Sequence, residues 1–219
     1  VGAIIATPLV TFLALQYGWR TAFVVTGSIG FVWLIAWLLL FHVPEKHPRL
    51  TAEEFTLIRA DTPVLAAGPG ARIRTADLLR LPQTWGLLLS RFLSDPVWWF
   101  YLFWLPKYLV EHRGFTMVEM GMLAWLPYLT ADIGSVAGGL LSGYLIKHKW
   151  EVLKARSAGM LPFALMMPLS IGVAYTESRT VALVLICLVT FAHMAWKTNL
   201  VTITNDIYPK NVVGSVSGI

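Results

Sequence analysis

The sequence contains a series of long apolar blocks. The longest cover residues 21–41, 85–109, 117–146, 157–175 and 180–204, and a shorter one covers residues 1–16. A helix of about 20 residues crosses the ~30 Å hydrocarbon layer of a bilayer. The blocks therefore predict an all-α membrane protein whose helical bundle crosses the lipid bilayer several times.

Composition supports this prediction and excludes other classes. Hydrophobic residues make up 57% of the chain and charged residues 13%, whereas about 25% of the residues of a soluble domain are charged. The net charge of +5 comes from basic residues between the apolar blocks, so nucleic-acid binding is not expected. Cys187 is the only cysteine, which excludes an intrachain disulfide and a cysteine metal site. Both ends lie in apolar or small-residue runs, and we expect a longer natural protein.

The basic residues also predict the orientation. They concentrate in the connections 43–84 and 147–156, whereas the intervening connections carry one each, at Arg20, Arg113 and Arg179. Cytoplasmic loops of membrane proteins are enriched in Lys and Arg. We therefore place loops 43–84 and 147–156 in the cytoplasm.

The long connection has helix signals of its own. Thr51 and Glu54 form a capping box that predicts a helix over 52–60, and Thr75 can begin a second helix reaching residue 81. The stretch 62–71 is rich in Pro and Gly and is typical of a linker. These features predict three parts: 1–42 as the end of one helical group, 43–84 as a cytoplasmic loop, and 85–219 as a second group.

Block 85–109 carries charged residues that are costly within a membrane, by about 2.5–3.5 kcal/mol each on insertion scales. Arg91 and Asp95 are spaced i, i+4 and could pair on one face. Pro96 removes the backbone bond to the carbonyl of Phe92 and bends the helix there. Asp95, Trp98 and Tyr101 are candidate site residues, although packing or lipid contact would also explain aromatic residues here.

Block 117–146 begins with a second capping box, Thr116 and Glu119. It then presents a polar stripe that we expect to face the bundle interior: Tyr128, Asp132, Ser135 and Gly139. Tyr128 and Asp132 are candidate binding residues, and Asp132 could equally be a structural partner of another helix. Two small-residue series predict close helix packing: Gly134, Gly138 and Ser142, and Ser135, Gly139 and Gly143.

Block 180–204 is the most informative. His193 and Lys197 share a face at i, i+4, and Asn199 follows. Lys197 lies too far from either end of the block to reach the interface, so it needs an anion or a water-filled cavity. An ammonium, an imidazole and an amide suit a carboxylated sugar. The alternative is that Lys197 neutralises Asp95 or Asp132 across the bundle.

No enzyme signature stands out: there is no HExxH, no GxSxG and no glycine-rich phosphate loop. We therefore predict a protein that is not an enzyme and needs no cofactor.

Several motifs resemble the major-facilitator transporters of the anion:cation symporter group, most closely those for hexuronates. They are GWRTAF at 18–23, PEKHPRLTAEE at 44–54, DPVWWFYLFWLPKYL at 95–109, HMAWKTN at 193–199 and NDIYPK at 205–210. The resemblance implies twelve helices in two halves, with substrate between the halves and alternating access. The chain would then cover helices five to ten and the start of helix eleven, with helices seven and ten lining the cavity.

The resemblance implies proton symport of a hexuronate by a monomer in the bacterial inner membrane. Another organic anion (galactonate, glucarate or an aromatic acid) and a non-transporting ligand sensor are the alternatives. Two departures matter. The stretch 138–150, GGLLSGYLIKHKW, lacks the acid of a gate motif common after helix eight. The family's coupling acid and main carboxylate-binding arginine lie in helices one and four, outside these residues.

Overall fold

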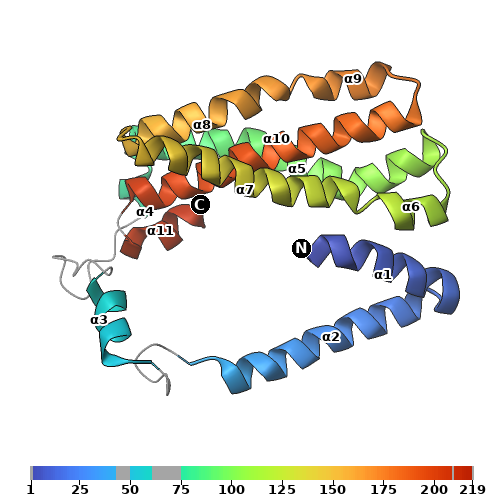
Figure 1. Cartoon of the computed structure of the whole chain (residues 1–219), viewed down its shortest axis with the longest axis horizontal. Coiled ribbons are helices and arrows are strands. Elements are labelled where there is room, and N and C mark those ends of the chain that lie inside the picture. Colours follow the sequence, from blue (N-terminus) through green and yellow to red (C-terminus); the bar gives the residue numbers. More distant parts are fainter. Residues whose placement is uncertain (1, 43–49, 61–74, 209, 219) are drawn as a thin grey trace. The chain divides into compact units, whose positions relative to one another are not determined.

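The computed structural model is helical throughout residues 2–42, 50–60, 75–208 and 210–218, the part of the chain that it describes, with short connections and no strand there (Figure 1). The helices are α1 (Gly2–Tyr17), α2 (Trp19–Leu40), α3 (Ala52–Ala60), α4 (Thr75–Leu78), α5 (Pro82–Glu111), α6 (Met117–Leu123), α7 (Leu126–Lys147), α8 (Val152–Met166), α9 (Leu169–Tyr175), α10 (Arg179–Ile207) and α11 (Lys210–Ser217). The all-α fold class predicted from the sequence is confirmed.

The chain divides into two compact units. One contains Val1–Phe12 and Ile73–Ile219, and the other contains Leu13–Arg72. The three-part division at residues 42 and 84 stays a prediction, because compactness alone does not define the halves of a membrane bundle. The predicted linker 62–71 lies outside the described residues.

In the smaller unit, α2 is long enough to cross a bilayer, and its large apolar side chains, such as Phe31 and Leu38, are exposed. Exposed apolar side chains along a spanning helix are what contact with lipid requires. The predicted capping box of α3 is confirmed: Thr51 N donates to Glu54 Oε2 at 3.0 Å, and Glu54 N donates to Thr51 Oγ1 at 3.3 Å. Helix α3 has the predicted bounds, whereas α4 ends three residues early, at Leu78.

In the larger unit, α5, α7, α8 with α9, and α10 lie alongside one another (Figure 1). Four segments of the described chain are long and apolar enough to span a membrane: Trp19–Leu40, Met117–Lys147, Val152–Tyr175 and Arg179–Ile207. Helix α5 has 30 residues but is not among them. It carries Arg91, Asp95, Lys107 and Glu111, and charged residues lower its mean hydropathy. The polarity of α5 indicates a helix that faces something other than lipid along part of its length.

Two of the predicted continuous blocks are broken helices. The block 117–146 is interrupted at Ala124 and Trp125, two residues before Pro127, and the block 157–175 is interrupted at Met167 and Pro168. Proline has no N–H to donate to the preceding turn, which is why each break falls beside one. The capping box at the start of the first block is confirmed, since Thr116 and Glu119 satisfy each other's backbone N–H groups.

Helices α7 and α10 approach to backbone contact. A methyl group added at Gly134 would overlap the carbonyl oxygen of Phe191, and one added at Gly138 would overlap that of Ala195. Ser142 completes the series by facing Gly159 of α8, where an added methyl group would lie 3.1 Å from Ser142 Cβ. The predicted packing role of this first small-residue series is confirmed.

The second series behaves differently. Methyl groups added at Gly139 or Gly143 would meet no atom within 4 Å. Ser135 does bond to a neighbouring helix, through its hydroxyl and that of Thr198, which lie 2.7 Å apart. The expectation of close packing along Gly139 and Gly143 is therefore wrong for the described residues, because these glycines lie on the side of α7 that no described helix covers.

Polar networks tie the ends of the bundle. At the end that holds the α5–α6 connection, the Arg113 guanidinium donates to Tyr108 Oη at 2.7 Å and to the carbonyl oxygens of Val173 and Thr176. Arg179 at the start of α10 pairs with Glu119 at 2.9 Å.

At the other end, Arg156 pairs with Asp206 at 3.0 Å and donates to Ser142 Oγ at 2.9 Å. Asp206 lies in the last turn of α10, which ends at Ile207, so this ion pair joins α8 to the end of α10.

Candidate functional site

The centre of the candidate site is an ion pair between α5 and α10. Lys197 Nζ lies 2.8 Å from Asp95 Oδ1, and the two side chains are 24% and 38% exposed. Arg91 lies one turn before Asp95, but the described ion pair of Asp95 is with Lys197. The sequence left open whether Lys197 binds an anion in a cavity or neutralises an acid across the bundle. The structure contains the ion pair between Lys197 and Asp95. It joins the two helices within the apolar part of the bundle.

This ion pair has little support from hydrogen bonds. Asp95 Oδ1 is inaccessible to solvent and makes no hydrogen bond. Its contact with Lys197 is an ion pair whose angles do not meet those of a hydrogen bond. By contrast, Asp206 receives a hydrogen bond from its arginine, at 3.0 Å. A partly buried pair without further hydrogen bonds recovers only part of its desolvation cost. The Asp95 carboxylate is therefore open to exchange of its partner.

An aromatic stack borders the pair. The rings of Trp98 on α5 and His193 on α10 are nearly parallel, with 7° between their planes and 6.0 Å between their centroids. His193 is only 3% exposed, and its Nε2 atom has no hydrogen-bond partner. Since Trp98 and His193 lie one turn from Asp95 and Lys197, the structure brings four of the predicted residues together on two facing helices.

A cavity of about 440 Å³ adjoins this cluster between α5, α8, α9 and α10. Its polar and aromatic lining consists of Ser90, Ser94, Tyr101, Ser170, His193 and Trp196. Asp95 and Lys197 do not line it, so among the predicted residues Tyr101 and His193 face a different space from the ion pair. The volume lies in the range of small-molecule sites, about 300–1,000 Å³.

The serines in this lining were missed from the sequence. Ser90, Ser94, Val97 and Tyr101 recur at the three- and four-residue intervals of one helix face. This periodicity shows that the four residues share one helix face. It does not by itself predict a cavity, because serines occur on many helix faces that line no site.

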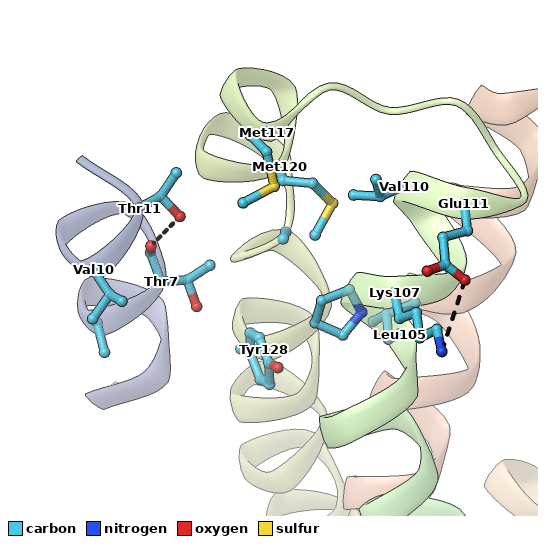
Figure 2. Close-up of a pocket in the computed structure, with 13 residues that line it drawn as sticks. Thr7, Val10, Thr11, Leu105, Lys107, Val110, Glu111, Met117, Met120 and Tyr128 are labelled. Carbon is cyan, nitrogen blue, oxygen red and sulfur yellow. Dashed lines mark hydrogen bonds and ion pairs between the residues drawn. The ribbon is translucent and has the colours of Figure 1, made fainter. Parts of the chain in front are cut away.

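Tyr128 lies elsewhere. It lines a cavity of about 570 Å³ whose walls come from α5, the α6–α7 region and residues 6–11 of α1 (Figure 2). Figure 2 shows Tyr128 on the same side of this cavity as Met120, with Thr7 and Thr11 on the α1 side. Lys107 and Glu111 border it as an exposed pair at 3.9 Å. The structure therefore does not bring Tyr128 into the Asp95–Lys197 cluster.

Asn199 also lies outside the cluster. Asn199 is fully buried, and its amide donates to the carbonyl oxygens of Gly138 at 2.9 Å and Ala195 at 3.2 Å. Its donors are thus used in the α7–α10 contact, and it lines none of the described cavities. Asp132 is half-buried on α7. We therefore leave Asn199 out of the proposed site and keep Asp132 as a prediction.

Comparison with known proteins gives the family. The whole chain, residues 1–219, matches the model of the Major Facilitator Superfamily. It is 30% identical over 223 residues to a hexuronate transporter of Escherichia coli K12, covering 100% of this chain and 51% of that protein. It is 32% identical over 169 residues to a galacturonate transporter of Dickeya chrysanthemi, covering 76% of this chain and 49% of that protein.

A third relative is a D-galactonate transporter of Escherichia coli O6:H1, 24% identical over 232 residues, with 100% of this chain and 53% of that protein covered. The chain thus spans about half the length of the curated relatives it matches. The family match and the apolar helices together indicate a multi-pass membrane protein. With its whole length matched, this chain belongs to the major facilitator superfamily.

Proposed function

We propose that the protein carrying this chain transports a sugar acid, with a hexuronate as the first candidate, across a bacterial inner membrane. The observation that carries the proposal is the Lys197 ammonium, held in the middle of α10 and only 24% exposed. A cation at such a position is costly unless it faces an anion, and its counter-ion Asp95 makes no hydrogen bond through Oδ1, so a substrate carboxylate could also serve it. Transport rather than catalysis is the activity that this family and these relatives support.

The chemistry of the cluster fits such a substrate. Lys197 supplies a positive charge for a carboxylate, and the half-buried ring of Trp98, one turn from Asp95, supplies an aromatic surface for a polyhydroxylated ring. The three relatives above are named for hexuronate, galacturonate and D-galactonate, which are all carboxylated sugars. Proton symport with alternating access by a monomer is the mechanism that we propose for it.

Counterflow tests the activity. Full-length protein would be reconstituted in liposomes preloaded with unlabelled glucuronate or galacturonate, and entry of the radiolabelled sugar acid measured. We expect accumulation above that of empty liposomes. If neither label accumulates but galactonate or glucarate does, the hexuronate part of the proposal fails; if ligands bind without any counterflow, a membrane sensor replaces the transporter.

Substitution of Lys197 tests the site. Lys197→Ala should weaken hexuronate binding about tenfold or more, because loss of an ion pair to a charged ligand group costs roughly 1.5–3 kcal/mol. Lys154→Ala is a matched control, since Lys154 pairs with Glu151 at 2.9 Å but is 76% exposed. If calorimetry shows that Lys197→Ala binds the hexuronate with unchanged affinity, Lys197 has only a structural role.

A further inference from the structure

The end of α7 carries basic and aromatic side chains that the proposed function does not use. We propose that these side chains bind the phosphate headgroup of an anionic phospholipid, with Lys147 and Lys149 as its cationic ligands. The site lies at one end of α7 rather than between α5 and α10, so it does not depend on which solute the protein transports.

Helix α7 ends in a backbone motif in which glycine is the usual residue. The Trp150 N–H donates to the carbonyl oxygen of Leu145 at 3.2 Å, and the Lys149 N–H donates to that of Ile146 at 2.9 Å. These two bonds define a Schellman motif, in which the residue just after the helix has a left-handed backbone. That residue is Lys149, with a φ of 65°. Within the described part of the chain, no other residue except glycine has a positive φ.

A lysine at this position is unfavourable for the fold. The left-handed conformation brings Cβ close to the following carbonyl oxygen, whereas glycine has no Cβ and adopts it freely. Backbone strain of this kind concentrates at binding sites and switch regions. The rule that cytoplasmic loops are basic requires positive charge anywhere in the connection 147–156, so it does not explain a lysine in a strained conformation. The backbone therefore indicates a role for the Lys149 ammonium at the end of α7.

The two proposed ligands carry charges that are not balanced by a nearby acid. Lys147 and Lys149 are both exposed, and among the described residues neither has an ion-pair partner. The other basic residues of the connection are already paired: Lys154 lies 2.9 Å from Glu151, and Arg156 makes its 3.0 Å ion pair with α10. Two unbalanced ammonium groups at one helix end attract an anion, and phosphate oxygens accept the hydrogen bonds that ammonium groups donate.

Exposed apolar side chains around the lysines favour a lipid as the source of the phosphate. Tyr144 and Trp150 are 59% and 48% exposed, and Val152 and Leu153 at the start of α8 are exposed as well. Tryptophan and tyrosine are enriched at the headgroup level of membranes, and basic clusters beside a spanning helix bind acidic headgroups. A free phosphate ion gains nothing from these apolar groups. A phospholipid places its phosphate at the lysines and its acyl chains beside the helix.

The test compares two phospholipids with the same acyl chains. Full-length protein in detergent is titrated with phosphatidylglycerol or phosphatidylcholine, and the bound lipids are counted by native mass spectrometry. Phosphatidylglycerol should bind more tightly by about fivefold for each of the two lysines, which is the affinity that one basic residue near a membrane surface contributes. Glycerophosphate has the phosphate without the acyl chains and should not compete at equal concentration. If it does compete, the assignment to a lipid is overturned.

Lys149→Gly is the decisive variant, because glycine keeps the left-handed turn and removes the ammonium. It should keep or raise the melting temperature and lose about fivefold in affinity for phosphatidylglycerol. Lys149→Arg keeps the charge and should keep the affinity. Lys107→Gln removes the same charge near the other end of the bundle and should leave the affinity unchanged. The proposal is overturned if folded Lys149→Gly binds phosphatidylglycerol as tightly as the wild type, or if Lys107→Gln loses as much affinity as Lys149→Gly.

Discussion

Helix α10 packs against two neighbours in opposite ways. Against α7 it makes backbone contact, because Gly134 and Gly138 leave no side chain between the helices. Against α5 the contact includes an ion pair and a ring stack, with cavities beside both. Helix packing in membranes depends on close van der Waals fit, so the first contact is the more stable of the two.

The two contacts of α10 therefore have different roles: the one with α7 stabilises the bundle, and the one with α5 carries the candidate site. The α7–α10 contact also holds Asn199, whose amide is used between the two helices. The α5–α10 contact holds the charged groups Asp95 and Lys197 and the unpartnered Nε2 atom of His193, whereas Asn199 Oδ1, which also lacks a partner, belongs to a fully buried side chain. A binding site needs groups whose partners can change, and those groups lie on the α5 side.

The glycine contact should tolerate no added side chain. Gly138→Ala places a methyl group on the Ala195 carbonyl oxygen, so we expect a loss of about 3 kcal/mol in unfolding free energy. Gly139→Ala is the matched control, since its methyl group meets no atom within 4 Å. Thermal unfolding of the full-length protein in detergent measures both. Equal stability of the two variants would mean that α7 and α10 do not meet in this way.

Arg113 should matter more to α5 than the exposed ion pair near it. Arg113→Ala leaves the carbonyl oxygens of Val173 and Thr176 without their guanidinium donor, and hydrogen bonds to a charged group contribute about 1.5–3 kcal/mol. We expect a loss near 2 kcal/mol. Lys107→Ala breaks a 3.9 Å pair between side chains that are each more than half exposed, and should change stability little. The same unfolding measurement compares them, and a larger effect at Lys107 would contradict the assignment.

The Asp95–Lys197 pair should contribute less to stability than either of these. In a double-mutant cycle with Asp95→Ala and Lys197→Ala, we expect a coupling of roughly 1 kcal/mol, within the 0.5–3 kcal/mol typical of contacting residues. The reason is that neither side chain is fully buried and Asp95 Oδ1 makes no hydrogen bond. A coupling above that of a tightly held buried pair would indicate a structural lock and argue against partner exchange.

The smallest effect is expected for the hydroxyl pair beside the glycine contact. Ser135→Ala removes the 2.7 Å bond to Thr198 Oγ1 and should cost about 0.6 kcal/mol, the average for polar contacts between membrane helices. Val136→Ala, on an exposed part of α7, is a comparison of similar size. A loss of several kcal/mol at Ser135 would make the hydroxyl pair a main support of the bundle.

Much of this fold follows from local sequence signals. The capping boxes at Thr51 and Thr116 act within four residues, so their helices begin where predicted. The Gly134–Gly138 spacing predicts a close helix contact because it needs only the helical repeat. The breaks beside Pro127 and Pro168 were not predicted, because a proline in the first turn of a helix and one inside it look alike in an apolar sequence.

The site could be predicted only in part. Polar and aromatic groups within apolar blocks predict Asp95, Trp98, His193 and Lys197 as site residues, and the structure places these four together. The same reasoning predicts Asn199 as a site residue, yet its amide bonds to the backbone of α7. The sequence of one helix shows which residues are polar, whereas the direction of each depends on which helices become its neighbours. Tyr128 lies apart from the cluster for the same reason.

Helix α5 contains Pro96 and Pro106, each of which leaves a carbonyl of the preceding turn without a backbone donor. Bending at either proline breaks no backbone hydrogen bond, so α5 can bend at two places. Helices α7 and α10 are held rigidly together by their backbone contact. When the helices move relative to one another, α5 is the helix that bends, and Pro96 is the residue next to Asp95. A small change in the bend angle at Pro96 would therefore directly change the distance between Asp95 and Lys197.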